Sequence, residues 1–376
     1  MNTLQHKILS FLFIAVIGLV WSNQQLHFIK DTKSAENRGR ATRPKININQ
    51  LDSYPKKYNT YYEDNFSLRN RLIKWHTYVV THIFHKNLVS NKVVIGKNDW
   101  LYIVDHELDN YRGIDLFDST QLRLLKNEFE YRNNILKKQG IKMYFIIVPD
   151  KYSIYSENLP DYVKKGNPTR SQQVVNYFAK YSDVKVIYAV DSLRKYKGEI
   201  PLYYKYDNHW NELGAYYFSK IITSYLQQDS IHVFNHDIND YTLTSKPRLR
   251  GDISSMLPGT KEYIEKSYSL IPKFHAADTI DTIRYVCPYN FSLAYRYQFL
   301  FSNNNPELAN AVIIRDSFGD NLMPYFRNNV NNSVFIFDAW QYNFNLEIID
   351  NEQPDAVIYL VLENLIGNIL DHLTIK

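Results

Sequence analysis

The chain reads QLRLLKNEFEYRNNILKKQGIKMYFIIV at Gln121–Val148, where a helical pattern is joined to a continuous apolar run. Apolar residues recur at helical spacing through about Gln121–Lys138, and Gly140 follows as a stop signal. Lys142–Val148 then predicts a strand that is buried on both faces. A helix that leads through a short turn into such a strand is a repeating part of a parallel sheet.

The same alternation recurs along the chain and sets the fold class. The other expected pairs are a helix at Ser171–Tyr181 before a strand at Val184–Val190, and a strand at Leu202–Tyr206 before a helix at Glu212–Leu226. The late strands are expected at Ala311–Ile314, Ser333–Phe337 and Ala356–Val361. These elements predict an α/β fold of three layers, in which helices cover both faces of a parallel sheet. No internal repeat is visible.

The N-terminus predicts export. Ile8–Trp21 is an uncharged apolar run preceded by Lys7, and Ser22–Gln25 offers no small-residue cleavage pattern. A retained signal anchor is therefore favoured over a cleaved signal peptide, and both remain open for residues 1–30. Either interpretation places the rest of the chain outside the cytoplasm.

The remaining organisation follows from polarity and periodicity. The polar stretch Asp31–Lys45 predicts a linker, within a linker region at 31–57, and the main domain is expected at 58–376. This domain should begin with a helical region at Tyr58–Val89 and two short strands at Val93–Gly96 and Trp100–Ile103. Residues 227–310 are rich in Asn, Ser, Pro and Tyr, which predicts an irregular insertion near the active face.

Composition excludes several classes of protein. The formal charge of +5 over 376 residues is dispersed and makes no basic stripe, so nucleic acid is not an expected partner. The single cysteine, Cys287, cannot form an internal disulfide, and the Cys/His spacing of a zinc site is missing from the sequence. His76, His82 and His85 lie near one side of a predicted helix without accompanying carboxylates. We therefore expect neither a metal nor a cofactor.

A candidate nucleophile follows the strand at Ala311–Ile314. Ser317 stands in a short turn before a helix that begins near Asn321, at the carboxyl end of a parallel strand, where open α/β sheets place ligands. Backbone N–H groups at the helix start, including that of Gly319, would stabilise an oxyanion. The competing interpretation is that Asp316 or Ser317 only caps the helix.

A serine hydroxyl needs a base that a carboxylate holds in one tautomer. The segment Asp207-Asn208-His209 offers both groups, because residues two apart in an extended segment project to one side. It lies between a predicted strand and a predicted helix, on the same edge as Ser317. The alternative is that Asp207 or Asn208 caps the next helix and His209 packs beside it.

Two long motifs contain the candidate residues: YDNHWNELGAYYFSKII (Tyr206–Ile222) and IIRDSFGDNLMPYF (Ile313–Phe326). Four further segments accompany them: EDNFSLRNRL (Glu63–Leu72), VVIGKNDWLYI (Val93–Ile103), VPDKYSIYSENLP (Val148–Pro160) and RLRGDISSML (Arg248–Leu257). Together these segments resemble, in the same order, motifs of the alginate O-acetyltransferase group of SGNH-hydrolase-like proteins. The similarity covers the chain from about Tyr58 onward.

The resemblance implies an SGNH-hydrolase-like, flavodoxin-like sheet and serine-dependent acetyl transfer to an exopolysaccharide, with Ser317 as nucleophile, His209 as base and Asp207 as its orienter. Because acetyl-CoA is cytoplasmic, the expected donor partner is a membrane-bound O-acyltransferase. Asp99, Ser156 and Asn208 depart from the group's pattern, which leaves specificity and the polymer open.

Further candidates and rival functions complete the expectations. Lys151 and Tyr155 follow a strand on the predicted active edge as candidate substrate-binding residues, with a solvated lysine and a packed tyrosine as the alternative. Trp210 is a candidate sugar platform, although packing beside the base is favoured. The rival functions are a carbohydrate acetylesterase, in which water replaces the sugar acceptor, and a non-catalytic polysaccharide-binding scaffold.

Overall fold

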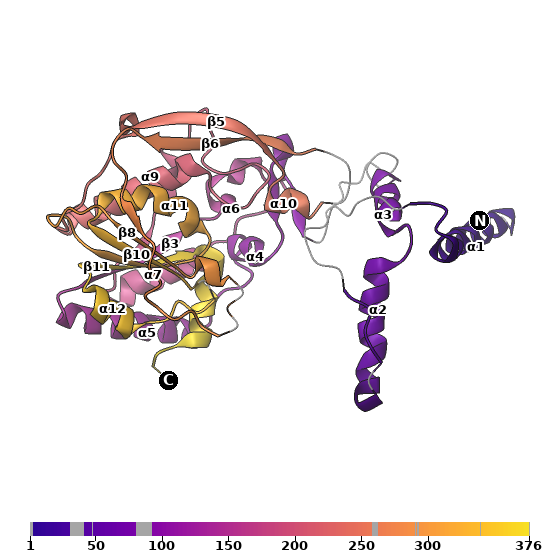
Figure 1. The fold of residues 1–376 in the computed structure, drawn as a ribbon, viewed down its shortest axis with the longest axis horizontal. Helices are drawn as coiled ribbons and strands as arrows, with labels where there is room; N and C mark the ends of the chain where they lie inside the picture. The colour runs from indigo at the N-terminus through magenta and orange to yellow at the C-terminus, as the bar shows by residue number, and fades with distance from the viewer. Residues whose placement is uncertain are drawn as a thin grey trace. The chain divides into compact units, whose positions relative to one another are not determined.

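The computed structural model describes residues 3–30, 41–46, 48–79, 92–257, 262–289, 291, 293–338 and 340–375. By packing, the chain divides into two compact units. Residues 1–90 with 254–262 form the first unit, and residues 91–253 with 263–376 form the second. Each unit is described by itself below (Figure 1). The domain start expected near residue 58 stays a prediction.

The first unit is helical. It contains α1 (Thr3–Leu26), the 3-10 turn η1 (Ile48–Ser53), α2 (Tyr54–Asn65) and α3 (Arg69–Tyr78). Within α1, His6–Leu26 has a mean hydropathy of 1.5 and is long and apolar enough to cross a membrane. The predicted helical region is broken at Leu68, which adopts φ 63° before α3. Residues 31–40 and 80–91, including His82 and His85, lie outside the described part of the chain.

The second unit contains a seven-stranded sheet of order β4-β3-β11-β9-β10-β8-β7. Its strands are β4 (Val186–Tyr188), β3 (Lys142–Val148), β11 (Ala356–Leu362), β9 (Ala311–Arg315), β10 (Asn332–Phe337), β8 (Gln298–Ser302) and β7 (Asp278–Ile280). The first five are parallel, as predicted. The central strands β3, β9 and β11 are almost wholly buried, which explains why their sequences are continuous apolar runs.

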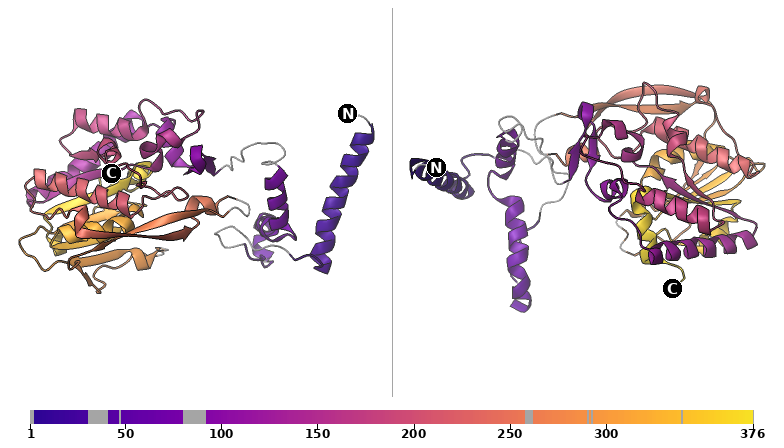
Figure 2. Two further views of the ribbon diagram at one scale, coloured as in Figure 1. Left: turned by 90° about the horizontal axis from the view of Figure 1, so that it is seen from above. Right: turned by 180° about the vertical axis from the view of Figure 1, so that it is seen from behind.

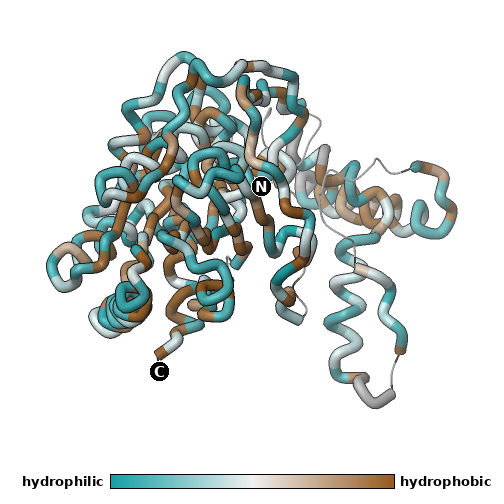
Figure 3. Tube along the Cα trace, turned by 60° about the vertical axis from the view of Figure 1, so that its left-hand side comes forward, coloured by the Kyte–Doolittle hydropathy of each residue, from teal (hydrophilic) through white to brown (hydrophobic). Residues whose placement is uncertain are grey.

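Helices cover both faces of the sheet, which confirms the predicted three layers (Figures 1 and 2). Tyr144 and Ile146 of β3 pack on the side of α9 (Glu212–Gln228) and α11 (Phe318–Phe326). Phe145 and Ile147 face the side of α5 (Ser119–Lys138), α7 (Arg170–Tyr181) and α12 (Leu346–Glu352). Hydrophobic residues follow the inner strands, whereas many outer turns are hydrophilic (Figure 3).

Short elements connect these layers. They are the strand pair β1 (Val93–Ile95) and β2 (Leu101–Ile103), the helices α4 (His106–Arg112), α6 (Lys151–Ile154), α8 (Val190–Arg194) and α10 (Asp252–Ser255), and the 3-10 turns η3 (Lys97–Asp99), η4 (Ser156–Asn158), η5 (Ile238–Asp240), η6 (Ala294–Arg296), η7 (Arg327–Asn329) and η8 (Glu363–His372). The predicted pair of short strands at 93–103 is therefore confirmed, with β1 and β2 antiparallel.

The expected irregular insertion is more ordered than the sequence suggested. Residues 227–310 contain the antiparallel hairpin of β5 (Tyr241–Leu249) and β6 (Ile264–Pro272), and they add β7 and β8 to the sheet as antiparallel strands. The sheet is therefore mostly parallel, as predicted, and the antiparallel pairings of β8 with β10 and of β7 with β8 extend it at this edge. Most of β5 is exposed to solvent, so it has no apolar face that a period-two pattern would reveal.

The strand predicted at Leu202–Tyr206 does not form. Its residues enter a turn in which Tyr203 makes an isolated bridge with Trp210. The apolar and aromatic side chains that suggested a strand are buried in the core from this turn, because Leu202 and Tyr203 have no exposed surface. Burial without alternation is common to strands and packed turns, so the pattern alone does not separate them.

Candidate active site

The nucleophile turn joins β9 to α11. Asp316 is buried; its Oδ1 accepts the N–H of Phe318 at 2.8 Å, and its Oδ2 accepts the Leu362 N–H at 2.7 Å and the Tyr342 hydroxyl at 2.9 Å. Burial raises the pKa of Asp316, although these three donors oppose that effect. Asp316 therefore supplies the cap and the hydrogen bonds that fix the turn. Ser317 makes no side-chain capping bond, so its hydroxyl is available for other chemistry.

The histidine turn is the segment that the Tyr203–Trp210 bridge closes, and it comes directly before the start of α9. Asn211 is the cap of α9, since its Oδ1 accepts two backbone N–H groups at 3.0 Å. The alternative in which Asp207 or Asn208 caps this helix is therefore wrong. The turn presents Asp207 and His209 on the same side, as their spacing predicted.

The structure brings Asp207, His209 and Ser317 into one hydrogen-bonded chain. The Oδ1 of Asp207 lies 2.8 Å from His209 Nδ1, and His209 Nε2 lies 3.0 Å from Ser317 Oγ. Asp207 Oδ1 also accepts the backbone N–H of His209 at 3.1 Å. A carboxylate at Nδ1 holds the proton on that nitrogen, which leaves Nε2 free to accept the serine proton. This geometry suits acyl transfer through an activated serine.

Asp207 is also held by groups on the opposite side. Its Oδ2 accepts Arg248 Nη2 at 2.6 Å and the backbone N–H of Asp252 at 3.2 Å. Burial by itself would raise the pKa of Asp207, but the hydrogen bonds from His209 and Arg248 hold it well below its usual range. Asp207 therefore remains ionised wherever a histidine base would operate.

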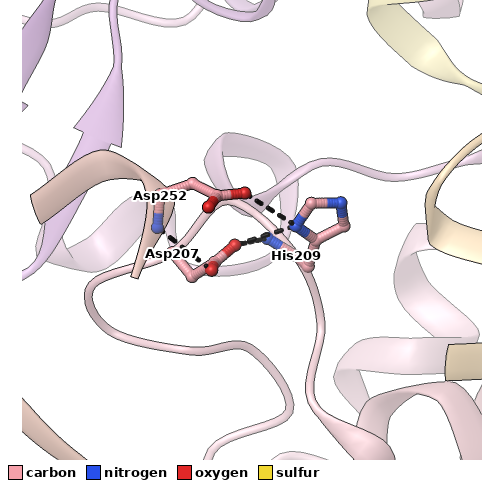
Figure 4. Close-up of side chains that lie close together, drawn as sticks. All are labelled: Asp207, His209 and Asp252. Atoms are coloured by element: carbon pink, nitrogen blue, oxygen red, sulfur yellow. Dashed lines mark hydrogen bonds and ion pairs between the residues drawn. The ribbon is translucent and has the colours of Figure 1, made fainter. Parts of the chain in front are cut away.

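Asp252 is the second carboxylate beside the imidazole. Figure 4 shows Asp207 and Asp252 approaching the same side of His209. Ligand atoms of the three residues lie within 4.8 Å of one another, close enough to surround a cation. Arg248 already places a positive charge on Asp207, and His209 Nδ1 is engaged by Asp207. These contacts favour a hydrogen-bonding role for the cluster over metal binding.

Lys151 has no exposed surface, which contradicts both interpretations of its sequence position, a substrate-binding lysine and a solvated one. Its side chain is fully buried, and its Nζ donates to the carbonyl oxygens of Tyr204 at 3.0 Å and Lys205 at 3.4 Å, and to that of Asp207. Burial lowers the pKa of Lys151 to about 8, although Asp207 and other nearby carboxylates oppose the shift. Lys151 thus stabilises the backbone of the histidine turn from the protein interior, through hydrogen bonds to its carbonyl oxygens.

We expect Lys151→Met to destabilise the second unit, because the buried carbonyls of the turn lose their donor. The loss at pH 7 should be about 2–4 kcal/mol. The wild-type lysine pKa is lower in the folded state, at about 8, than in the unfolded chain, so its folded form gains stability as pH rises above 8. The difference in unfolding free energy between wild type and variant should therefore widen from pH 7 to 9.5.

Chemical denaturation at the two pH values measures this difference, and Lys164→Met at an exposed position provides the control. If the difference in unfolding free energy between wild type and Lys151→Met stays constant or narrows as pH rises, the lowered pKa of Lys151 is contradicted.

Tyr155 and Trp210 are packed residues, so the substrate-binding alternative fails for both. Tyr155 stacks on Trp100 with ring centroids 4.4 Å apart and accepts the Leu202 N–H at 2.8 Å. Trp210 has no exposed surface, and its indole N–H donates to the Phe318 carbonyl at 3.1 Å. Trp210 therefore ties the histidine turn to the start of α11 and offers no face to a sugar.

Gly319 has a packing role, which corrects the expectation that its N–H binds an oxyanion. That N–H donates to the Asp316 carbonyl at 3.2 Å. A Cβ at this position would lie 2.5 Å from Cδ of Arg315, so only glycine lets the turn close over the buried arginine. The remaining support for an oxyanion beside Ser317 is the positive end of α11.

Gly251 allows the segment before α10 to reach Asp207. A Cβ on Gly251 would lie 2.4 Å from the Tyr206 carbonyl oxygen and 2.7 Å from Cβ of Asp207. We expect Gly251→Ala to displace Asp207 and to lower the rate of ester hydrolysis by about 10- to 100-fold. Steady-state hydrolysis of p-nitrophenyl acetate measures the effect. Gly198→Ala is the matched control, because its Cβ would meet nothing within 4 Å; equal rates for the two variants would refute the expectation.

Sequence reasoning overlooked Arg248 and Asp252 as members of the site. Both lie in RLRGDISSML, which was noted only as a motif, and both approach Asp207 because of the hairpin that the sequence did not predict. The adjacent Arg-x-x-Gly-Asp pattern was the available signal. Nothing in it indicates which carboxylate the arginine would contact.

Comparison with known proteins shows which proteins this chain is similar to. Residues 93–275 match the family model described as the SGNH hydrolase-like domain of acetyltransferase AlgX. This range includes Asp207, His209, Arg248 and Asp252 and ends before Ser317, so the nucleophile rests on geometry. A probable alginate O-acetylase AlgJ from Pseudomonas syringae pv. tomato is 26% identical over 167 residues, which cover 43% of this chain. The match spans 40% of that relative's length.

Solved structures agree on the fold. PatB1 of Bacillus cereus superposes with a TM-score of 0.55 and 21% identity, covering 74% of this chain and 99% of PatB1. PatB1 with a sulfonyl adduct gives a TM-score of 0.57 and 21% identity, covering 75% and 99% of the two chains. The resemblance drawn from the motifs is confirmed: residues 93–275 of this chain match the model of the SGNH hydrolase-like domain of acetyltransferase AlgX, and the rest of the second unit completes the fold that PatB1 shares.

Proposed function

We propose that this protein is a serine-dependent O-acetyltransferase that acts on hydroxyl groups of an exopolysaccharide or cell-envelope glycan. The observation that carries the proposal is the hydrogen-bonded chain from Asp207 through His209 to Ser317, with contacts of 2.8 and 3.0 Å. It lies beside the carboxyl end of β9, within a fold of the SGNH type. The name of the AlgJ relative, an alginate O-acetylase, supports a polysaccharide as acceptor.

The proposed reaction has two half-reactions. His209 Nε2 removes the proton of Ser317, Oγ attacks the acyl carbonyl of the donor, and the imidazolium returns the proton to the donor's leaving group. This step leaves an acyl-serine. His209 then removes the proton of a sugar hydroxyl, whose oxygen attacks the acyl-serine, and Ser317 recovers its proton as the ester departs. The positive end of α11 stabilises the oxyanion in both steps.

The location and donor belong to the same proposal. The apolar span in α1, at His6–Leu26, supports anchoring in the inner membrane with the second unit on the extracytoplasmic side. Acetyl-CoA is not found there, so the acetyl group must be delivered across the membrane. We propose a membrane-bound O-acyltransferase as the partner that supplies it.

The first test is covalent labelling. A relative of this fold carries a sulfonyl adduct, so methylsulfonyl fluoride is a suitable probe for a nucleophilic serine. Mass spectrometry of the full chain, purified in detergent, should locate one sulfonyl group on Ser317 and none in His209→Ala. An unlabelled Ser317 would contradict the proposal and favour the non-catalytic scaffold.

The second test separates transferase from esterase. The full chain is incubated with p-nitrophenyl acetate and with host envelope polysaccharide whose esters have been removed by mild alkali. Ester-linked acetate should appear on the polysaccharide. Release of free acetate alone, at the same rate with and without polysaccharide, would identify an acetylesterase.

A further inference from the structure

The carboxylate that orients His209 is electrically compensated from its other side. Arg248 Nη2 donates to Asp207 Oδ2 at 2.6 Å, whereas Oδ1 of the same carboxylate faces His209 at 2.8 Å. The two side chains carry opposite unit charges, and Asp207 is buried. Asp207 and Arg248 together therefore present little net charge to the imidazole.

The hairpin positions this arginine. Arg248 on β5 pairs in register with Glu265 on β6, its Nη1 lies 3.5 Å from Glu265 Oε1, and its guanidinium stacks over the Tyr204 ring at 4.1 Å. Glu265 Oε2 accepts the Lys205 N–H at 2.6 Å. Arg248 is thus fixed by a cross-strand carboxylate and an aromatic face, which hold its charge on Asp207.

Asp252 is an additional negative charge next to the same ring nitrogen. Its Oδ2 lies 3.9 Å from His209 Nδ1, and its side chain is largely exposed. Its backbone N–H donates to Asp207 Oδ2, so the position of Asp252 is linked to that of the orienting carboxylate. The surrounding protein partly desolvates this carboxyl although much of its surface is exposed, and this effect and repulsion from Asp207 raise the pKa of Asp252.

We propose that two carboxylates divide the work that one performs in an ordinary serine triad. Asp207, compensated by Arg248, orients His209 and selects its tautomer, while Asp252 supplies the net negative charge that stabilises the imidazolium formed during the reaction. Asp252 thus acts through its charge, without orienting the ring. Arg248 is a positioning residue that acts through Asp207. The inference rests on the proposed function, because it concerns the protonated state of its base.

The charges around His209 support this division. The positive groups are Arg248, which contacts Asp207 and also acts on Asp252 through space, the buried Lys151, and Arg296, which acts on Asp252 and forms an ion pair with Asp320. The negative groups are Asp207, Asp252 and Glu265. Ser317 and Phe318, which complete the contacts of the ring, are uncharged. Among the described residues, Asp252 is the carboxylate beside Nδ1 that no arginine contacts directly.

The test is the pH dependence of kcat/KM for p-nitrophenyl acetate, an uncharged substrate, with the full chain between pH 5 and 9. Asp252→Asn removes the countercharge, so it should lower the plateau about 10-fold and move the acid limb to lower pH by about half a unit or more. Arg248→Gln leaves Asp207 uncompensated, so it should move the acid limb to higher pH. Arg248→Lys preserves the charge and should leave the limb in place.

The matched control is Asp278→Asn. Asp278 is an exposed carboxylate 3.7 Å from His275, a similar pair at a different place in the fold, and its replacement should change neither the plateau nor the limb. A limb that stays fixed in Asp252→Asn, or shifts in the same direction in Asp252→Asn and Arg248→Gln, overturns the inference. If Arg248→Gln proves unstable, Asp252→Asn decides alone, because the substituted side chain is exposed and its backbone bond is retained.

Ser317→Ala separates this inference from the proposed function. Wild-type hydrolysis in Ser317→Ala would refute the proposed function itself. An inactive Ser317→Ala together with an unshifted Asp252→Asn would refute only the division of roles between the carboxylates.

Discussion

Ser317→Ala should lower acetyl transfer by about 1,000-fold or more, with the fold unchanged. The hydroxyl is the group that would form the acyl-serine. Its oxygen is hydrogen-bonded to His209 Nε2 at 3.0 Å. Asp316 holds the turn through its own bonds to Phe318, Tyr342 and Leu362, so removing the hydroxyl leaves the turn intact. The measurement is ester-linked acetate on envelope polysaccharide from a deletion strain that expresses the variant.

Two controls make this result interpretable. Thermal unfolding of Ser317→Ala should match wild type within the effect of one partly buried hydrogen bond, about 1 kcal/mol. Ser302→Ala, on strand β8 between β10 and the edge strand β7, removes a serine hydroxyl from another part of the sheet and should leave acetylation unchanged. Normal polysaccharide acetylation in a Ser317→Ala strain would eliminate the serine mechanism.

Asp207→Asn should be nearly as damaging, with a fall in kcat on the order of 1,000-fold. The reason lies in the two neighbours of the carboxylate. Arg248 can only donate, so the asparagine oxygen must face Arg248 and its amide NH₂ must face His209 Nδ1. That arrangement forces Nδ1 to accept and moves the ring proton to Nε2, which can then no longer take the serine proton.

The second prediction is checked by kcat for p-nitrophenyl acetate at pH 8, where a neutral histidine would otherwise be competent. The free energy of unfolding should also fall, because the lowered pKa of Asp207 shows that its ionised form stabilises the fold through His209 and Arg248; kcat is therefore measured on protein that circular dichroism shows to be folded. Asp237→Asn, at an exposed 3-10 turn in the same unit, serves as the control. A fall of less than 10-fold in Asp207→Asn would show that His209 does not depend on this carboxylate for its tautomer.

The sheet was predictable where burial left a simple pattern. β3 and β11 are covered on both faces, so nearly every residue is apolar, and their sequences indicate strands without knowledge of the neighbours. The hairpin of β5 and β6 was not predictable in this way. The residues of β5 are mostly exposed and those of β6 mostly half-buried, and the two strands pair with each other in a sheet of their own.

The candidate site also has features that the sequence predicted and features that it did not. Asp207 and His209 are two residues apart, so the turn alone brings them together, and the motif containing Ser317 indicated the third member. Lys151 and Trp210 were assigned to the active edge on sequence position, yet both are buried. Sequence position placed these residues near the correct edge but did not indicate whether their side chains face solvent or the core.

The amino-acid sequence by itself determined the apolar N-terminal helix, the parallel strands, and the identities of the serine, histidine and aspartate in the candidate site. Local periodicity and short spacing encode those features, because each depends on residues that are neighbours in the chain. Only the tertiary structure decided that Ser317 meets His209 across 108 positions and that Arg248 and Asp252 flank Asp207. Such contacts depend on how distant segments pack, and no local pattern of residue types specifies that packing.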